Sequence, residues 1–268
     1  MIPAAVEHVR PSSLAEALEA LASPDAKALA GGQSLLPVMK LRIVRPSVLV
    51  DIGRLELSGV HMDENDLRLG ALTTWDELES APELDRPPLA AIAECASVIG
   101  DLQVRNRGTL GGSLAHADPA SDMPAVMLAL GARLILRTAG NERSVSAEEF
   151  FLGPFTTALA PGELITEVVV PRIDGSASAY AKVEHPASGF ALAGAAARVS
   201  PDGKQRVAVT GVGAHPFLLP ADTDPLDALA EAEVYGDRFA PVEYRRHVAG
   251  IVATRALERA RRRMEEER

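Results

Sequence analysis

The sequence is poor in cysteine: Cys95 is the one thiol among 268 residues. One thiol cannot form an internal disulfide, and it cannot hold an iron–sulfur cluster alone, because such clusters take about four thiolate ligands. Cys95 lies in "LAAIAECASVIG", an apolar helical pattern, so we expect it to pack in the core. The low cysteine content also predicts a reducing, cytoplasmic location.

Basic charge and long apolar runs are scarce as well. The formal net charge is -10, which disfavours binding to nucleic acid or to an anionic membrane surface. No apolar run approaches the ~20 residues that span a bilayer, so we expect no stable membrane insertion. The start "MIPAAVEHVRPSS" lacks the basic and apolar regions of a secretory signal. The length allows one large domain or two or three compact ones.

Several catalytic and nucleotide motifs are missing. The sequence has no G-x-x-x-x-G-K-[ST], no G-x-S-x-G and no metal spacing such as H-E-x-x-H among its histidines. The stretch "GVGAHP" at 211–216 is loosely similar to a dinucleotide fingerprint. However, His215 and Pro216 stand where the helix and the third glycine should be, which favours a strand end.

Apolar periodicity predicts an α+β layout with a boundary near residues 172–178. Ser13 with Glu16, and Thr74 with Glu77, have capping-box spacing and predict two helix starts. Further helices are predicted in "PPLAAIAECASVIG", after Asp122, in "DPLDALAEAEVYG" and from Pro241 onward, and strands in "AKALAGG", "SVLVDI", "LRLGA", "ARLILRT", "ELITEVVVP", "SAYAKVE", "GFALAGAAARVS" and "KQRVAVTGVG". Residues 101–120 are predicted to be irregular, and the charged tail "RARRRMEEER" to be a solvated helix end.

Two glycine pairs stand out, in "LAGGQSLLPVMKLR" at 29–42 and in "RGTLGGSLAHADPASDMPA" at 107–125. A lone glycine pair is most often a turn. Two such loops could hold a diphosphate from both sides, because glycines let phosphate approach unpaired backbone N–H groups closely. Ser34, Thr109 and Ser113 would add hydroxyl donors. These residues alone predict no more than a phosphorylated small-molecule ligand.

The two glycine motifs, in this order, resemble those of the FAD-binding medium subunit of carbon-monoxide-dehydrogenase-type molybdenum hydroxylases, the xanthine dehydrogenase family. The similarity extends to "AKVEHPASGFALAGAAA" and "PVEYRRHVAGIVATRALERA" and so covers nearly the whole chain. It implies an α+β fold of the vanillyl-alcohol-oxidase type (PCMH-like), with FAD-binding subdomains at 1–55 and 56–175. A C-terminal α+β domain at 176–268 would carry a three-stranded antiparallel sheet.

The resemblance also implies where FAD would lie: extended between the two subdomains, with the diphosphate between the glycine loops and the flavin ring toward the C-terminal domain. The implied contacts on the first loop are Leu29, Ala30, Gly31, Gly32, Gln33, Ser34 and Leu35. Those on the second are Gly108, Thr109, Leu110, Gly111, Gly112, Ser113 and His116. No catalytic residue and no metal ligand is implied.

Four implied contacts lie outside the loops. Ile99 would lie against adenine, Asp122 would accept hydrogen bonds on the ribose or adenine side, and Lys182 would lie near the flavin or the diphosphate. Phe190 would cover the flavin ring. Each has a structural alternative: Asp122 as a helix N-cap, Ile99 and Phe190 as core residues, and Lys182 as a surface strand residue. The sequence departs from the family at Ser113, often asparagine, and at Gly189, often acidic.

The function implied is that of a flavoprotein subunit of an oxidoreductase that is inactive on substrate by itself. A small subunit with [2Fe–2S] clusters would deliver electrons to the FAD, which would pass them to a quinone or NAD. A large subunit with a molybdenum cofactor would oxidise the substrate. The three chains would form a heterotrimer, expected to dimerise. The alternatives are a stand-alone flavin oxidoreductase of the same fold and a non-catalytic interaction module.

Overall fold

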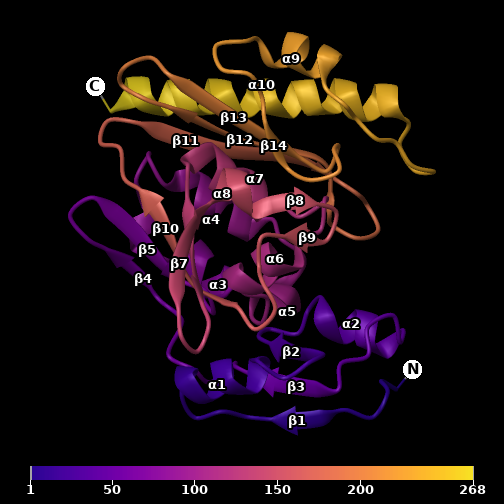
Figure 1. Ribbon diagram of the computed structural model, residues 1–268. Helices are drawn as coiled ribbons and strands as arrows, with labels where there is room; N and C mark the ends of the chain where they lie inside the picture. Colours follow the sequence, from indigo (N-terminus) through magenta and orange to yellow (C-terminus); the bar gives the residue numbers. More distant parts are fainter. Residues whose placement is uncertain (1, 268) are drawn as a thin grey trace.

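The N-terminal region of the computed structural model, which describes residues 2–267, is a small parallel sheet with two helices (Figure 1). Its strands have the order β1-β3-β2. Helix α1 buries Ala17, Leu18 and Leu21 against this sheet, and Ser13 accepts a hydrogen bond from the Glu16 amide as its capping spacing predicts. The elements are β1 (Glu7–Val9), α1 (Leu14–Leu21), β2 (Ala26–Leu29), α2 (Leu35–Lys40) and β3 (Val48–Asp51).

The middle region contains a five-stranded antiparallel sheet with the order β4-β5-β10-β6-β7. Strand β10 lies in the centre of this sheet, where it pairs with β5 on one side and with β6 on the other, although β5 lies far before it in the sequence. The strands are β4 (Val60–Met62), β5 (Asp66–Gly70), β6 (Arg133–Arg137), β7 (Glu142–Ser146) and β10 (Leu164–Pro171). A separate hairpin consists of β8 (Phe151–Gly153) and β9 (Thr156–Thr157).

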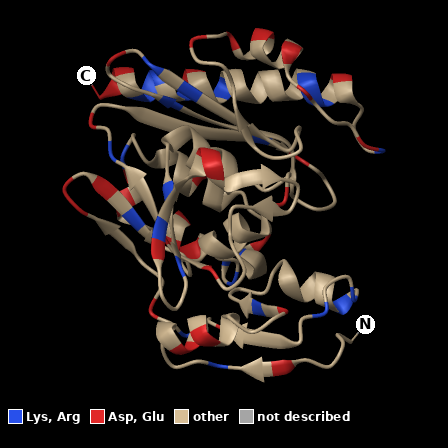
Figure 2. Cartoon of the chain, in the orientation of Figure 1, with Lys and Arg blue, Asp and Glu red and all other residues tan. Residues whose placement is uncertain are grey.

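The helices of the middle region surround α7 (Met123–Leu130), whose eight residues are all buried. Its sequence MPAVMLAL has no charged side chain, in contrast to the outer elements coloured red and blue in Figure 2. An all-apolar helix of this kind is stable only in the interior. The others are α3 (Trp75–Glu79), the 3-10 helix η1 (Pro82–Asp85), α4 (Ala90–Ser97), α5 (Leu102–Arg105), α6 (Leu110–His116) and α8 (Ala147–Phe150).

The C-terminal region is an antiparallel sheet, β11-β12-β13-β14, between two layers of helix. Its alternating side chains divide between two cores: Tyr180 and Ala196 face α4 and α7, whereas Ala179 and Ala195 face α10. Figure 1 shows α10 lying along the outer side of this sheet. The elements are β11 (Ala177–Glu184), β12 (Ala191–Val199), β13 (Gln205–Thr210), β14 (Phe217–Leu218), α9 (Pro225–Glu231) and α10 (Val242–Glu266).

The α+β prediction is confirmed, and three local predictions need correction. The expected three-stranded sheet gains a fourth strand, the two-residue β14. Residues 101–120 are not irregular but contain α5 and α6. The C-terminal tail is not simply solvated, because Arg259 and Arg263 both donate to Glu94 on α4 and to backbone carbonyls of β11. Figure 2 shows blue, basic segments near the C-terminal end of α10.

The domain limits 1–55, 56–175 and 176–268 stay a prediction, although each main sheet lies inside one of these ranges. Packing crosses the predicted limits, since Leu72 and Leu164 belong to the N-terminal core and Tyr180 to the central one. Among residues 2–267, no helix has both the length and the apolar character needed to cross a bilayer.

The Arg143–Glu163 pair ties β7 to the start of β10 across the intervening strand β6, and it generates a stability prediction. Arg143 donates twice to the Glu163 carboxylate at 2.7 Å, and the Ala160 amide donates a third hydrogen bond at 2.7 Å. The Arg143 hydrogen bonds hold the pKa of Glu163 below its ordinary value. We expect Glu163→Gln to lower the free energy of unfolding by about 2 kcal/mol at about pH 7.

The sign of the pH dependence follows from the lowered pKa. Because the folded carboxyl is more acidic than the unfolded one, its stabilising effect is complete above the unfolded pKa and is lost as the pH falls through the folded pKa. Urea unfolding of both proteins should therefore show a difference that shrinks as the pH falls below the ordinary glutamate pKa of about 4.3. A difference independent of pH would contradict this account.

Candidate cofactor site

The first glycine loop joins the end of β2 to the start of α2. Leu29 is the last residue of β2, Leu35 is the first of α2, and residues 30–34 connect them. Gly32 has a φ of +78°, a conformation that disfavours any residue with a Cβ. Ser34 occupies the N-cap position of α2, but its side chain makes no capping hydrogen bond. The hydroxyl of Ser34 is therefore available to a ligand.

The second glycine loop is the start of helix α6 rather than an open loop. Thr109 is its N-cap and accepts a hydrogen bond from the Gly112 amide at 3.3 Å. The amides of Leu110 and Gly111 donate to the carbonyls of Thr73 and Ala71 at 2.9 and 2.8 Å. An ideal Cβ at Gly111 would lie 2.6 Å from the Ala71 Cβ. Glycine here thus serves close packing of α6 on the segment after β5.

The two loops meet backbone to backbone. An ideal Cβ at Gly31 would lie 1.8 Å from the Arg107 carbonyl oxygen and 3.1 Å from the Gly108 Cα. The same construction at Gly112 lies 3.8 Å from the Ala30 Cβ. Figure 1 agrees, showing β2 and α2 directly facing α5 and α6. The predicted convergence of two bends distant in sequence is present in the structure.

The supply of free backbone donors is unequal between the loops. The amides of residues 30–34 donate to no acceptor within residues 2–267, and the same holds for Thr109. By contrast, the amides of Leu110, Gly111, Gly112 and Ser113 are all used inside the chain. The expectation that both loops present unpaired amides is therefore wrong for most of the second. A row of free amides beside a Cβ-free contact suits an oxyanion such as a diphosphate.

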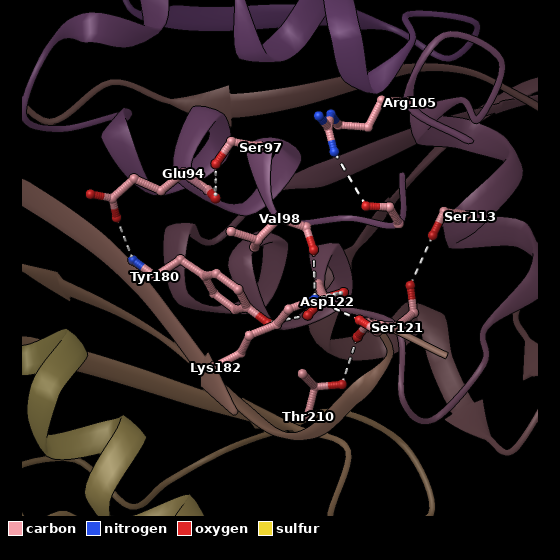
Figure 3. A network of polar contacts seen from close by, with 12 residues as sticks. Glu94, Ser97, Val98, Arg105, Ser113, Ser121, Asp122, Tyr180, Lys182 and Thr210 are labelled. Carbon is pink, nitrogen blue, oxygen red and sulfur yellow. Dashed lines mark hydrogen bonds and ion pairs between the residues drawn. The ribbon is translucent and has the colours of Figure 1, made fainter. Parts of the chain in front are cut away.

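Asp122 and Lys182 form a second group, brought together by α7 and β11 (Figure 3). The Lys182 Nζ lies 3.3 Å from the Asp122 Oδ2, and both side chains are nearly inaccessible, at 6% and 5% exposure. Lys182 also donates to the carbonyls of Val98 at 2.7 Å and Gly189 at 2.8 Å. Lys182 is thus not the surface strand residue of the alternative interpretation. Its three protons have three acceptors.

The alternative interpretation of Asp122, as a side chain that caps a helix, does not hold either. It stands at the N-cap of α7 but makes no capping hydrogen bond. Its Oδ1 instead accepts from the Tyr180 hydroxyl at 2.5 Å. Burial raises the pKa of Asp122, against the opposing effects of Lys182 and Tyr180, and it raises the pKa of Tyr180 well above its usual value. Nearby Cys95 is fully buried, and burial raises the pKa of its thiol, so it is a core residue.

The remaining predicted contacts lie around these two groups. Ile99 follows α4 and packs partly against the central core. Phe190 is 45% exposed, which excludes its alternative role as a core residue. His116 ends α6, its ring centroid lies 5.2 Å from that of Phe155, and burial lowers its pKa. The structure leaves the cofactor-contact role of all eighteen residues a prediction.

Hydrogen bonds from hydroxyl groups tie the segment before Asp122 to the second glycine loop and to β13. Ser113 on α6 and Ser121 share a hydrogen bond of 2.9 Å. Thr210, at the end of β13, donates to the carbonyls of Ser121 at 2.6 Å and Pro119 at 3.0 Å. Figure 3 shows Ser113, Ser121 and Thr210 near Asp122. Ser113, the departure from the usual asparagine, therefore has a partner within the chain.

Sequence reasoning missed Tyr180, Ser121 and Thr210. A signal for Tyr180 was present, because it precedes Lys182 by two residues in a predicted strand and must share its face. Ser121 and Thr210 gave no comparable signal, since their hydrogen bond joins distant segments. A pocket of about 700 Å³ opens between α4, β11 and α10 and reaches Lys182. None of its lining residues belongs to a glycine loop, so it is not the predicted diphosphate site.

The family model described as FAD binding domain in molybdopterin dehydrogenase matches residues 4–173, more than half of the chain. The chain belongs to this family. The glyceraldehyde dehydrogenase medium chain of Sulfolobus acidocaldarius is 43% identical, over 81% of this chain and 79% of its own length. The carbon monoxide dehydrogenase medium chain of Hydrogenophaga pseudoflava is 37% identical, over 97% and 98% of the two chains.

Similarity in structure agrees. A solved chain of carbon monoxide dehydrogenase from Hydrogenophaga pseudoflava, in a form lacking the Mo-pyranopterin moiety of its molybdenum cofactor, superposes with a TM-score of 0.91. The two chains are 36% identical, and the match covers 98% of this chain and 99% of that one. The predicted family, fold class and FAD cofactor are thereby confirmed. This chain is an FAD-binding medium subunit of the molybdenum hydroxylase type and a flavoprotein subunit of an oxidoreductase.

The contact between the loops generates a binding prediction. Gly31→Ala places a methyl group against the Arg107 carbonyl, and relief requires the two loops to separate. We expect the dissociation constant for FAD to rise about tenfold to a hundredfold, because overpacking of this kind costs roughly 1–3 kcal/mol. Titration of the apo chain with FAD, followed by quenching of flavin fluorescence, measures it.

Gly140→Ala is the matched control, because nothing lies within 4 Å of an ideal Cβ at that position. It should bind FAD like the unsubstituted chain. Equal affinities for all three proteins would show that the contact between the loops does not shape the FAD site.

Proposed function

We propose that this chain receives electrons from a partner subunit with [2Fe–2S] clusters and passes them on, through its FAD, to a quinone or NAD. FAD supplies the exchange between one-electron and two-electron steps when bound, and the protein supplies position and electrostatics. The observation that carries the proposal is the row of free amides at residues 30–34 against the second glycine loop. These amides give a diphosphate cofactor a fixed binding position in a chain of this family.

The residues of this chain divide the binding task by chemistry. In our proposal the amides of residues 30–34 and of Thr109 hold the diphosphate oxygens, and the Ser34 hydroxyl adds a donor. Ile99 and Phe190 contribute apolar surface to the cofactor. Lys182 and Asp122 hold a buried charge pair between them. All of these groups bind or orient, and none is asked to transfer a proton.

The partner assignment follows from the lone thiol. Cys95 is fully buried in the core and offers no ligand set for a cluster, so we place the [2Fe–2S] clusters on a separate small subunit. We place the molybdenum cofactor on a large subunit and propose a heterotrimer that dimerises in the cytoplasm. The names of the relatives, such as a medium chain of carbon monoxide dehydrogenase, support a multi-subunit assembly.

The test is purification of the tagged chain from its native host. We expect a yellow complex with stoichiometric FAD and two further subunits, one carrying iron and sulfide and one carrying molybdenum. When substrate reduces this complex, stopped-flow absorbance should show the clusters and then the flavin becoming reduced, and the flavin should be reoxidised by NAD or by a quinone. This comparison of acceptors also decides between the two.

The contrary outcomes are distinct. A chain that purifies alone and oxidises a substrate by itself would be a stand-alone oxidoreductase. A colourless chain that takes up no FAD would be an interaction module.

A further inference from the structure

The Tyr180 side chain directly contacts one of the residues predicted to bind the cofactor, Asp122. Its side chain is 3% exposed, and its hydroxyl reaches the Asp122 Oδ1 at 2.5 Å. Its backbone is held as well, because the amide donates to Glu94 at 2.8 Å and the carbonyl accepts from Arg259 at 2.8 Å. The hydroxyl therefore sits at a fixed point, and Asp122 must orient toward it.

The strand opposite makes room for this hydroxyl. Gly194 on β12 pairs with Lys182, and an ideal Cβ at Gly194 would lie 2.4 Å from the Tyr180 hydroxyl oxygen. Gly194 does not have a positive φ, so its backbone conformation does not require glycine. Because residue 194 has no side chain, the Tyr180 hydroxyl has room to lie beside Asp122.

The turn that carries Asp122 is fixed from the same sheet. Thr210, which pairs with Gly194, donates to the Ser121 carbonyl, and the Gly211 amide donates to the Pro119 carbonyl at 2.9 Å. With its backbone anchored, Asp122 has one oxygen on Tyr180 and the other toward Lys182, as Figure 3 shows. Removing the Tyr180 donor would leave a buried carboxylate with a free oxygen, which favours its rotation away from Lys182.

Lys182 in turn fastens two segments that belong to different regions. Its bond to the Val98 carbonyl holds the turn that carries Ile99, and its bond to the Gly189 carbonyl holds the loop that carries Phe190. These segments adjoin, because an ideal Cβ at Gly189 would lie 4.0 Å from the Gly100 Cα. Ile99 and Phe190, both predicted to contact the cofactor, are therefore carried by segments that lie side by side.

We propose that Tyr180 is a positioning residue for FAD: it fixes Asp122, which aligns Lys182, which clamps the Ile99 turn against the Phe190 loop. This inference rests on the proposed function, because the roles of Ile99 and Phe190 belong to it. Tyr180 touches no cofactor itself. Its effect on affinity passes through the clamp.

The experiment is a double-mutant cycle of Tyr180→Phe and Gly194→Ala, with the FAD dissociation constant measured at a temperature where circular dichroism shows every variant folded. Tyr180→Phe removes the donor to a charged acceptor and should weaken FAD binding about tenfold. Gly194→Ala should weaken it similarly by displacing the hydroxyl. In the Phe background Gly194→Ala should cost less than it does alone, because its closest contact, the hydroxyl oxygen at 2.4 Å, has been removed and the next, the Thr210 Cγ2, lies at 3.0 Å.

A purely structural role would give a different pattern. It would lower the melting temperature of the apo chain and leave the FAD dissociation constant unchanged, and that result overturns the proposal. Additive effects of the two substitutions on the FAD dissociation constant also overturn it. Failure of the unsubstituted chain to bind FAD would instead contradict the proposed function. Should both variants fail to fold, hydrogen exchange in the unsubstituted chain decides. FAD must then slow exchange in 98–100 and 185–190 together, and slowing in one segment alone overturns the clamp.

Discussion

The contact between Gly31 and the backbone of Arg107 and Gly108 is the constraint on which the site depends. A carbonyl oxygen occupies the position that a side chain at residue 31 would take, so the N-terminal sheet reaches the middle region without a layer of side chains between them. This contact places the free amides of residues 30–34 beside Thr109. Backbone donors form a preorganised anion site only where the chain is fixed, and close packing fixes it. In our proposal the first loop binds the diphosphate, and the second loop holds the first in place.

The buried charges form a second constraint, and it acts on the C-terminal region. A lysine and an aspartate removed from water lose hydration free energy that their mutual attraction repays only if their remaining donors and acceptors are also satisfied. Asp122 and Lys182 meet this condition through Tyr180 and the carbonyls of Val98 and Gly189. Since these partners come from α4, α7 and β11–β12, the charge pair can be satisfied only when the middle and C-terminal regions are docked.

The sequence predicts those parts of the fold that have local causes. The capping-box spacing at Ser13 and Thr74 and the apolar periods of α1, α4, α7 and α10 are local signals, and the structure contains each of these helices. The full box forms only at Thr74, because the Glu16 carboxylate accepts from the Ser12 amide instead. Helix α6 has no such signal, because two glycines lie in a helix of seven residues and glycine disfavours helix. It forms because Thr73 and Ala71 accept the amides of Leu110 and Gly111, and these acceptors cannot be inferred from residues 101–120. The N-cap interpretation of Asp122 was wrong for a related reason, since Tyr180 and Lys182 compete for its carboxylate from a strand far along the chain.

Glu94 shows how the outer helix contributes to the position of Lys182. Its carboxylate accepts from the backbone amide of Tyr180 and from the guanidinium groups of Arg259 and Arg263 on α10. The same arginines donate to the carbonyls of Tyr180 and Ser178, so α10 holds β11 both directly and through α4. An edge strand otherwise has unpaired backbone groups on its outer side. Here those groups are occupied by charged side chains, which fix the strand two residues before Lys182. The arginines of the C-terminal tail therefore have a structural role. They fix the position of β11 relative to α4, and β11 carries the Lys182 that contacts Asp122.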